Sequence, residues 1–288
     1  MIIVVDSTNR ERFSGLLDQM FRLRARVFGG RLGWQVQISE GREIDAFDAL
    51  DPAYVIGLDE TGHVVSCVRA LQTSGPHMLS DVFSAILGGD EPLRSPVVWE
   101  STRFCVDTER LGAADTRMSA SSATCELMIG SLEYAQSHGI TDIVTVIDPI
   151  MNRVLKRSAC APYDYLGETV QMGKVPAMAA LLDCTDARIS ALRNFIGVHG
   201  DVFATREQAR ALADANAVVS DVTESSPETA EAVSKALTRS ACLTPYLREQ
   251  AMNARTAEER HAVESLIRAL AQAGVIEDAE QFLADCAA

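Results

Sequence analysis

The sequence lacks the cysteine and histidine patterns that identify disulfide-stabilised and metal-binding proteins. Its seven cysteines are scattered, odd in number and form no CxxC pair, which argues against a disulfide framework and a zinc knuckle. The five histidines show neither HxxxH nor HExxH spacing, so we predict no metal site. We expect the cysteines to be reduced residues of the core.

Long apolar runs and an excess of basic charge are also missing. Stretches such as MAALL at 178–182 are far shorter than a membrane span, and the N-terminal MIIVVDSTNRER has no charged lead-in or cleavage site. The net charge of −14 argues against a nucleic-acid-binding protein, which needs a concentrated basic surface. We therefore expect a cytoplasmic protein with no nucleic-acid partner and no membrane partner.

The residues that are present suffice for a large core, since 47% of the 288 residues are hydrophobic. Residues 8–29 have apolar side chains near helical spacing, and Gly29 and Gly30 are predicted to end that helix. The turn DETG between two apolar segments indicates an antiparallel hairpin. The first strands are predicted at AYVIGLD, HVVSCVRAL and PVVWESTRFCV.

The following elements alternate between helix and strand. A buried helix is predicted at SASSATCELMIGSLEYAQSHG, ending at Gly139, and the strand ITDIVTVI comes next. In DPIMNRVLKRSA, Asp148 is the predicted N-cap and Pro149 the first helical residue. The remaining elements are the strands YLGETVQMG and VPAMAALLD and the helix TDARISALRNFIG. This order predicts an α/β sandwich around a mixed sheet.

The composition changes after about residue 213, where strand-like segments end and alanine, glutamate and arginine dominate. Helix starts are indicated at Ser226-Pro227, at Thr244-Pro245 and at the capping box TAEE, 256–259. An apolar face at helical spacing follows, formed by Val263, Leu266, Ile267 and Leu270. We predict a domain at 1–213 and a helical extension at 214–288, which serves oligomerisation, binds a partner or covers the core.

The segment WESTRFCVD at 99–107 places opposite charges inside a strand of otherwise core-like composition. In a flat strand Glu100 and Arg103 lie on opposite faces, because side chains alternate with a period of two. A β-bulge near Ser101 or Thr102 would turn both toward one cleft. The strand alone leaves two interpretations open, a catalytic carboxylate or a buried partner for the arginine.

Four segments carry charged and aromatic residues in a joint pattern: FRLRARVFGGRLGW, EIDAFD, VSCVRAL and WESTRF. The residues that form the pattern are Arg24, Phe28, Trp34, Asp45, Asp48, Arg69, Glu100, Arg103 and Phe104. Together the segments resemble the acyl-homoserine-lactone synthases, the LuxI-type autoinducer synthases, over roughly the first 200 residues. The resemblance implies an N-acetyltransferase-like α/β sandwich with a mixed, largely antiparallel sheet.

The resemblance also implies a two-step reaction. Such an enzyme N-acylates S-adenosylmethionine with an acyl group from an acyl thioester, carried by acyl carrier protein or by coenzyme A. It then lactonises the product and releases an acyl-homoserine lactone, a quorum-sensing signal, together with methylthioadenosine. No dissociable cofactor is expected, because S-adenosylmethionine is a substrate.

The resemblance gives Glu100 and Arg103 the catalytic roles, with Glu100 accepting the proton of the methionyl amine. Carboxylates suit the ammonium of S-adenosylmethionine, guanidinium groups suit its carboxylate, and aromatic rings suit its sulfonium or adenosyl part. The implied binding residues are Arg24, Phe28, Trp34, Asp45, Asp48, Arg69 and Phe104. Taken singly, each charged residue could equally belong to a structural ion network and each aromatic residue to the core. We expect the glycine-rich GGRLGW to be a loop ordered by ligand.

The helix predicted at 149–158 carries a basic face formed by Arg153, Lys156 and Arg157. This face is either a dock for an acidic carrier protein or acyl-CoA phosphates, or a set of cations that favour the helix macrodipole. Met151 and Leu155 of the same helix are candidates for the acyl pocket.

Two other functions remain open on the sequence. One is an acyl-CoA-dependent N-acyltransferase of the same fold, although its pyrophosphate loop pattern, R/Q-x-x-G-x-G/A, is not found. The other is a non-catalytic binding or regulatory protein that uses the helical extension for contacts.

Overall fold

The computed structural model describes residues 1–34, 36–112, 118–172 and 175–222, and in the C-terminal part residues 260, 264, 267–268, 271 and 279–287. Within these residues a mixed seven-stranded sheet has the spatial order β1 (Ile2–Val5), β4 (Ala53–Leu58), β5 (Val64–Gln72), β6 (Val98–Val106), β7 (Asp142–Ile147), β9 (Val175–Asp183) and β8 (Asp164–Met172). Neighbouring strands are antiparallel except β6 and β7, which are parallel. The predicted fold class and the predicted β4–β5 hairpin are confirmed.

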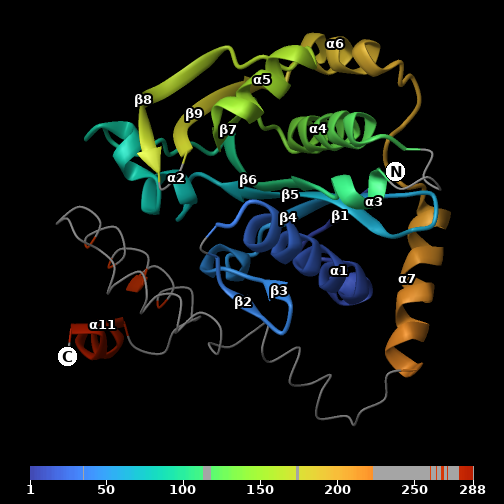
Figure 1. Ribbon diagram of the computed structural model, residues 1–288, viewed down its shortest axis with the longest axis horizontal. Coiled ribbons are helices and arrows are strands. Elements are labelled where there is room, and N and C mark those ends of the chain that lie inside the picture. Colours follow the sequence, from blue (N-terminus) through green and yellow to red (C-terminus); the bar gives the residue numbers. More distant parts are fainter. Residues whose placement is uncertain are drawn as a thin grey trace.

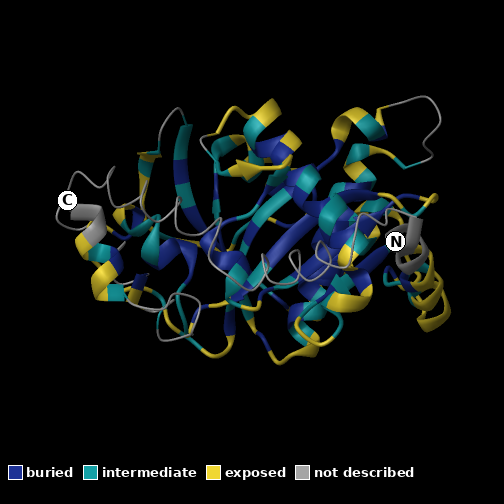
Figure 2. Cartoon of the chain, turned by 90° about the horizontal axis from the view of Figure 1, so that it is seen from below, coloured by how far each residue is buried: buried dark blue, intermediate teal, exposed yellow. Residues whose placement is uncertain are grey.

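Helices cover both faces of the sheet, α1 (Ser14–Arg24) on one and α4 (Ala120–Ser137) on the other (Figure 1). Side chains of β4 alternate between these layers, since Tyr54 and Ile56 join the apolar cluster of α1 while Val55 joins that of α4. Both faces of the central strands are therefore buried, and they form the dark interior of Figure 2. Five cysteines of the described residues are free and buried, as predicted.

The helices on the α4 side begin and end at the predicted signals. The side chain of Asp148 accepts a hydrogen bond from the Met151 backbone N–H at 2.7 Å and so caps α5 (Pro149–Arg157). Thr185 caps α6 (Asp186–Ile196), which ends at Gly197 in the left-handed region. In α4 the N-cap is Ser119, and Gly139 has a φ of 75° just after its end.

The prediction that Gly29 and Gly30 end the first helix is wrong. The helical segment has three parts, a 3-10 turn η1 (Arg10–Phe13), α1, and a π-helix η2 (Ala25–Arg31) that continues through both glycines. The Leu32 backbone N–H donates to the Val27 carbonyl at 2.9 Å, which is the wider i to i+5 bond of a π-turn. A Cβ at Gly29 would lie 2.4 Å from Ile38 Cδ1, so glycine here permits close packing rather than ending the helix.

Short elements not expected from the sequence connect the main strands. A two-stranded ribbon and a 3-10 turn follow η2, namely β2 (Ile38–Ser39), β3 (Arg42–Glu43) and η3 (Ala46–Ala49). Between β5 and β6 lie α2 (Met78–Asp81) and the 3-10 turn η4 (Ser84–Leu87), and β6 is followed by α3 (Thr108–Leu111). These connections carry part of the site described below.

The C-terminal part begins with α7 (Arg206–Val222), which runs across the predicted boundary at residue 213. Ala213 of this helix is buried in the apolar cluster of α1. A second described helix is α11 (Ala279–Ala287). The helix starts predicted at 226–227, 244–245 and 256–259 lie outside the described residues, as do Val263, Leu266 and Leu270; the division into two domains stays a prediction. No helix among the described residues combines the length and apolar character needed to cross a membrane.

Candidate active site

Strand β6 is interrupted by a β-bulge at Arg103. Cys67 of β5 pairs with Cys105 and Arg69 pairs with Thr102, so two residues of β6 lie opposite one residue of β5. Arg103 has a φ of 56°, a left-handed conformation that costs a non-glycine residue about 1–3 kcal/mol. The predicted bulge is confirmed, one residue beyond Thr102.

The bulge brings Glu100 and Arg103 to the same face of β6. The Glu100 carboxylate accepts a hydrogen bond from the Met78 backbone N–H at 2.7 Å, and Arg103 Nη1 lies 3.5 Å from the Met78 sulfur. Thr102 is on this face too, since its hydroxyl accepts from Arg69 Nε at 3.0 Å. Two consecutive side chains, 102 and 103, thus point to one side, which a regular strand does not allow.

A buried network of three arginines and three carboxylates lies on this face. Arg24 donates to both oxygens of Asp48 at 2.8 Å each and to Glu43 at 2.5 Å. Asp48 also accepts from the Tyr54 hydroxyl at 2.8 Å and from the Asp45 backbone N–H at 2.8 Å. The paired, two-point contact fixes the Arg24 guanidinium plane.

The other two arginines extend the network toward β6. Arg69 pairs with Asp45 and, at 2.9 Å, with Asp48. Arg103 Nη2 lies 2.6 Å from Asp45 and its Nε 3.1 Å from Glu43. Among the three arginines, Arg103 is 10% exposed at its side chain while the other two are fully buried. Arg103 is therefore the cation that a ligand can reach most easily.

The network compensates its own charges. Burial opposes the charge of Arg24, but Asp48 and Glu43 outweigh burial and raise the pKa of Arg24 well above its usual value. Burial likewise would raise the pKa of Asp48, yet Arg24 and Arg69 hold that pKa far below its usual range. Arg24, Arg69 and Asp48 are thus charged together in a buried place, which proteins tolerate when the pairing is this complete.

Glu100 is in a different environment from the three network carboxylates. It is fully buried and is held by two backbone N–H groups at the start of α2, from Met78 at 2.7 Å and from Leu79 at 2.6 Å. Among the described residues no arginine or lysine forms an ion pair with it; Arg103 pairs with other carboxylates. Burial outweighs the two hydrogen bonds and raises the pKa of Glu100 to about 7.

Two of the predicted aromatic residues adjoin the network, and one does not. Phe28 is buried and stacks on Trp34 with ring centroids 5.1 Å apart, while the Arg103 guanidinium lies 5.6 Å from the Phe28 ring centroid. Trp34 is 43% exposed, so one part of this stack faces solvent. Phe104 instead packs against the apolar clusters of α4 and α3 and takes no part in the network.

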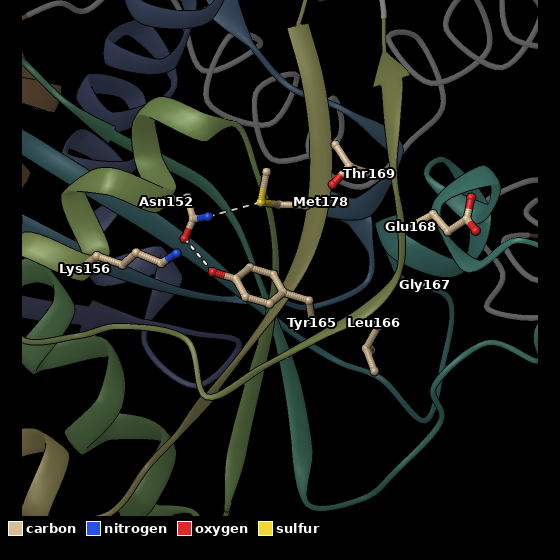
Figure 3. A pocket seen from close by; sticks show the side chains of 8 residues that line it. All are labelled: Asn152, Lys156, Tyr165, Leu166, Gly167, Glu168, Thr169 and Met178. Atoms are coloured by element: carbon tan, nitrogen blue, oxygen red, sulfur yellow. Dashed lines mark hydrogen bonds between the residues drawn. The ribbon is translucent and has the colours of Figure 1, made fainter.

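The residues predicted on α5 lie apart from the network. Arg153, Lys156 and Arg157 are exposed, Met151 is half-buried, and Leu155 is buried in the core. A cavity of about 270 Å³ lies between α5, β8 and β9 (Figure 3). Its lining residues are Asn152, Lys156, Tyr165, Leu166, Gly167, Glu168, Thr169 and Met178. Lys156 is thus the one predicted docking residue that reaches this cavity.

Three participants were not predicted from the sequence. Glu43 stands within the segment EIDAFD, two residues before Asp45, and this spacing on an extended chain was an available signal. Tyr54 and Met78 carried no signal, because their contacts with the network arise from sheet pairing and from the position of α2. Among the described residues, no group of histidine, cysteine, aspartate and glutamate side chains is placed to hold a metal ion.

Comparison with known proteins gives a consistent family. The model of the autoinducer synthase family matches residues 8–192. An acyl-homoserine-lactone synthase of Agrobacterium fabrum is 41% identical over 182 residues, which are 63% of this chain and 85% of the relative. One of Pseudomonas aeruginosa is 35% identical over 159 residues, 54% of this chain and 77% of the relative.

Solved structures agree with these relatives. The crystal structure of the AHL synthase LasI superposes with a TM-score of 0.59 at 29% identity, covering 72% of this chain and 98% of LasI. A CoA-dependent acyl-homoserine lactone synthase, BjaI, solved with SAM and isopentyl-CoA, gives a TM-score of 0.62 at 25% identity and covers 74% and 98%. Since the family model spans more than half of the chain, this protein belongs to the autoinducer synthase family.

Proposed function

We propose that this protein is an acyl-homoserine-lactone synthase that uses Glu100 as its general base. The observation that carries this proposal is a fully buried carboxyl whose pKa is raised to about 7, beside a charge-compensated network of arginines and carboxylates. A base works best when its pKa lies near the working pH, and this carboxyl meets that condition. The substrates would be S-adenosylmethionine and an acyl thioester.

In the first step the methionyl ammonium gives a proton to Glu100, directly or through one water. The neutral amine attacks the thioester carbonyl carbon and the carbon–sulfur bond breaks. The second proton of the attacking nitrogen passes to the leaving sulfur, which departs as the thiol, and Glu100 later releases the first proton to solvent. Arg103 would hold the substrate carboxylate, because it is the network arginine that solvent reaches. Arg24 and Arg69, fully buried, would act by holding Asp45 and Asp48 in place for the ammonium.

In the second step the carboxylate of the acylated substrate attacks its own carbon beside the sulfonium, and methylthioadenosine leaves with the carbon–sulfur electron pair. This displacement needs no base, so the protein mainly has to fold the substrate. Holding both ends in one pocket contributes roughly 7 kcal/mol or more to well-aligned intramolecular reactions. The stacked Phe28 and Trp34 would cover the sulfonium or adenosyl part. Both proposed steps use only the atoms of the two substrates and the residues named above, without a dissociable cofactor.

The acyl donor would approach along α5. Its exposed Arg153, Lys156 and Arg157 suit the phosphates of acyl-CoA or the acidic surface of an acyl carrier protein, and both donors remain in the proposal. Met151 is half-buried beside the core and is the better placed of the two acyl-pocket candidates, since Leu155 is enclosed by the core cluster. Cytoplasmic location and assembly through the C-terminal helices stay predictions.

The test is incubation of the full-length protein with S-adenosylmethionine and a panel of acyl-CoA and acyl-carrier thioesters, followed by mass detection of products. We expect an acyl-homoserine lactone and methylthioadenosine in equal amounts with at least one donor. A folded protein that forms neither product with any donor would refute the synthase function. Methylthioadenosine without lactone would refute the order of the two steps.

A further inference from the structure

Two apolar residues of the C-terminal extension lie in a cluster with residues that border the ion network. Ile267 is fully buried and Phe282 is 8% exposed. They share one apolar cluster with Phe47, Leu71 and Met78. Val82 and Phe83, which follow α2, and Ala279 and Leu283 of α11 pack against this cluster. The family match ends at residue 192, so this contact involves a part of the chain that the family model does not cover.

Met78 connects this cluster to the site on its other side. Its backbone N–H donates to Glu100 at 2.7 Å, and its sulfur accepts from Arg69 Nη2 at 3.2 Å and lies 3.5 Å from Arg103 Nη1. Phe47 of η3 also connects this cluster to the ion network, since the Arg69 guanidinium lies 5.6 Å from the centroid of its ring. Residues that touch the reacting groups are thus packed in one cluster with the extension.

The segment that holds Glu100 is packed in two apolar clusters. Leu79 is fully buried with Ile86 and Val98 in one of them, whereas Met78 lies in the cluster that contains Ile267 and Phe282. The helix α2 spans only Met78–Asp81, and it lies in the long connection between β5 and β6. So short a helix is not stable by its own hydrogen bonds and depends on packing for its position. In the apolar cluster of Met78, two of the buried residues, Ile267 and Phe282, come from the extension.

We propose that two described residues of the C-terminal extension, Ile267 and Phe282, form a clamp on the active site that holds α2 in position. The clamp keeps the Met78 and Leu79 N–H groups directed at Glu100 and keeps water away from this carboxyl. Ile267 and Phe282 are positioning residues, because they act through Met78. This inference rests on the proposed role of Glu100 as base. It gives Ile267 and Phe282 an indirect effect on the reaction, through the position of α2.

The experiment compares full-length Ile267→Ala, Phe282→Ala and the double variant with wild type. Arg268→Gln is the matched control, because Arg268 is an exposed residue of the same segment whose ion pairs are with Glu264 and Glu280. Backbone hydrogen exchange is measured by mass spectrometry in the peptide that contains Met78 and Leu79. We expect exchange there to be about 10-fold faster or more in the double variant, through local opening. Exchange in the β4–β5 hairpin should stay as in wild type and so shows that the variant is folded.

Kinetics then test the consequence for Glu100. The charged groups that act on Glu100, Arg69 of β5 and Asp81 of α2, are not substituted in the variant. With water admitted, the pKa of Glu100 should therefore fall toward its usual value, and the acidic limb of the pH–kcat profile should move to lower pH. The value of kcat at its optimum should fall on the order of 10- to 100-fold, because the base is less well positioned. A general loss of stability would reduce the amount of active enzyme but would not shift the acidic limb of the pH–kcat profile.

The outcomes separate the clamp from the proposed function. Unchanged exchange at Met78 and Leu79 in the double variant overturns the clamp, whether or not wild type makes lactone. If exchange at Met78 and Leu79 is faster but the acidic limb of the pH–kcat profile does not move, the proposed effect of the clamp on the pKa of Glu100 is overturned. If wild type makes no lactone, the proposed function is refuted but the clamp is not, since hydrogen exchange at Met78 and Leu79 still decides whether Ile267 and Phe282 hold α2. Should the double variant misfold, Ile267→Val, which removes one methylene, gives a smaller increase in the same exchange.

Discussion

Replacement of Glu100 by glutamine separates the proposed catalytic role of this residue from its effect on stability. The wild-type carboxyl has a pKa of about 7 in the folded protein against an ordinary value of 4.5. Between these values the folded state binds more protons than the unfolded state, so the free energy of unfolding falls as pH rises. The neutral amide of Glu100→Gln has no such dependence.

The size of the effect follows from the two pKa values. Between pH 5.5 and pH 8 the wild type loses about 2 kcal/mol of stability through this group, at about 1.4 kcal/mol per pKa unit. The variant loses one hydrogen bond from Met78 or Leu79, since an amide presents only one oxygen, but this cost is the same at both pH values. The stability of the variant relative to wild type should therefore rise by about 2 kcal/mol over this interval.

Urea denaturation of both proteins at the two pH values measures this difference, and both values lie above the isoelectric point of about 4.8. Glu207→Gln, at an exposed carboxyl of α7, controls for the chemical change. We further expect kcat to fall by about 10²- to 10⁴-fold with little change in S-adenosylmethionine affinity. A stability difference that does not vary with pH would refute the raised pKa. Equal losses in kcat and in affinity would make Glu100 a binding residue.

Other substitutions test the network and the aromatic stack. Arg103→Lys should weaken S-adenosylmethionine binding by about 10-fold or more in calorimetry, because an ammonium cannot replace the planar fork; unchanged affinity would contradict substrate contact. Tyr54→Phe should cost about 1 kcal/mol in urea denaturation, since Asp48 loses one donor, and a neutral result would show that the hydroxyl contributes nothing. Trp34→Ala should lower substrate affinity and leave stability within about 0.5 kcal/mol; the reverse pattern would make it a core residue.

The parts of the fold that depend on local signals could be predicted from the sequence. Asp148 and Pro149 mark the start of α5, because a helix N-terminus needs a side-chain acceptor and tolerates proline. The prediction that Gly29 and Gly30 end the first helix was wrong, because a glycine can also be required where another side chain packs closely against the backbone. The ion partners could not be predicted by spacing, because Arg103 and Glu43 lie 60 residues apart and meet only through the sheet.

The bulge could be anticipated but not positioned. Period-two alternation shows that Glu100 and Arg103 cannot share a face in a regular strand, so some irregularity was required. Its position depends on which residue of β6 loses its partner on β5, and that is decided by the pairing of Arg69 with Thr102. The family pattern named candidate site residues that single contacts would have left ambiguous. The structure brings most of them together but not Phe104, and Glu43 emerged only from the structure.

The separation of Glu100 from the ion network explains how one site could hold a charged substrate and still accept its proton. A carboxylate paired with arginine is a poor base, as the depressed pKa of Asp48 illustrates. Glu100 is fully buried, and burial outweighs its two amide donors and the attraction of Arg69, so its pKa is raised to about 7. The bulge at Arg103 places these two environments side by side on one strand. If Glu100 is the base, as proposed, an additional cation beside it would lower its pKa and slow acylation, even though it would add an ion pair to the fold.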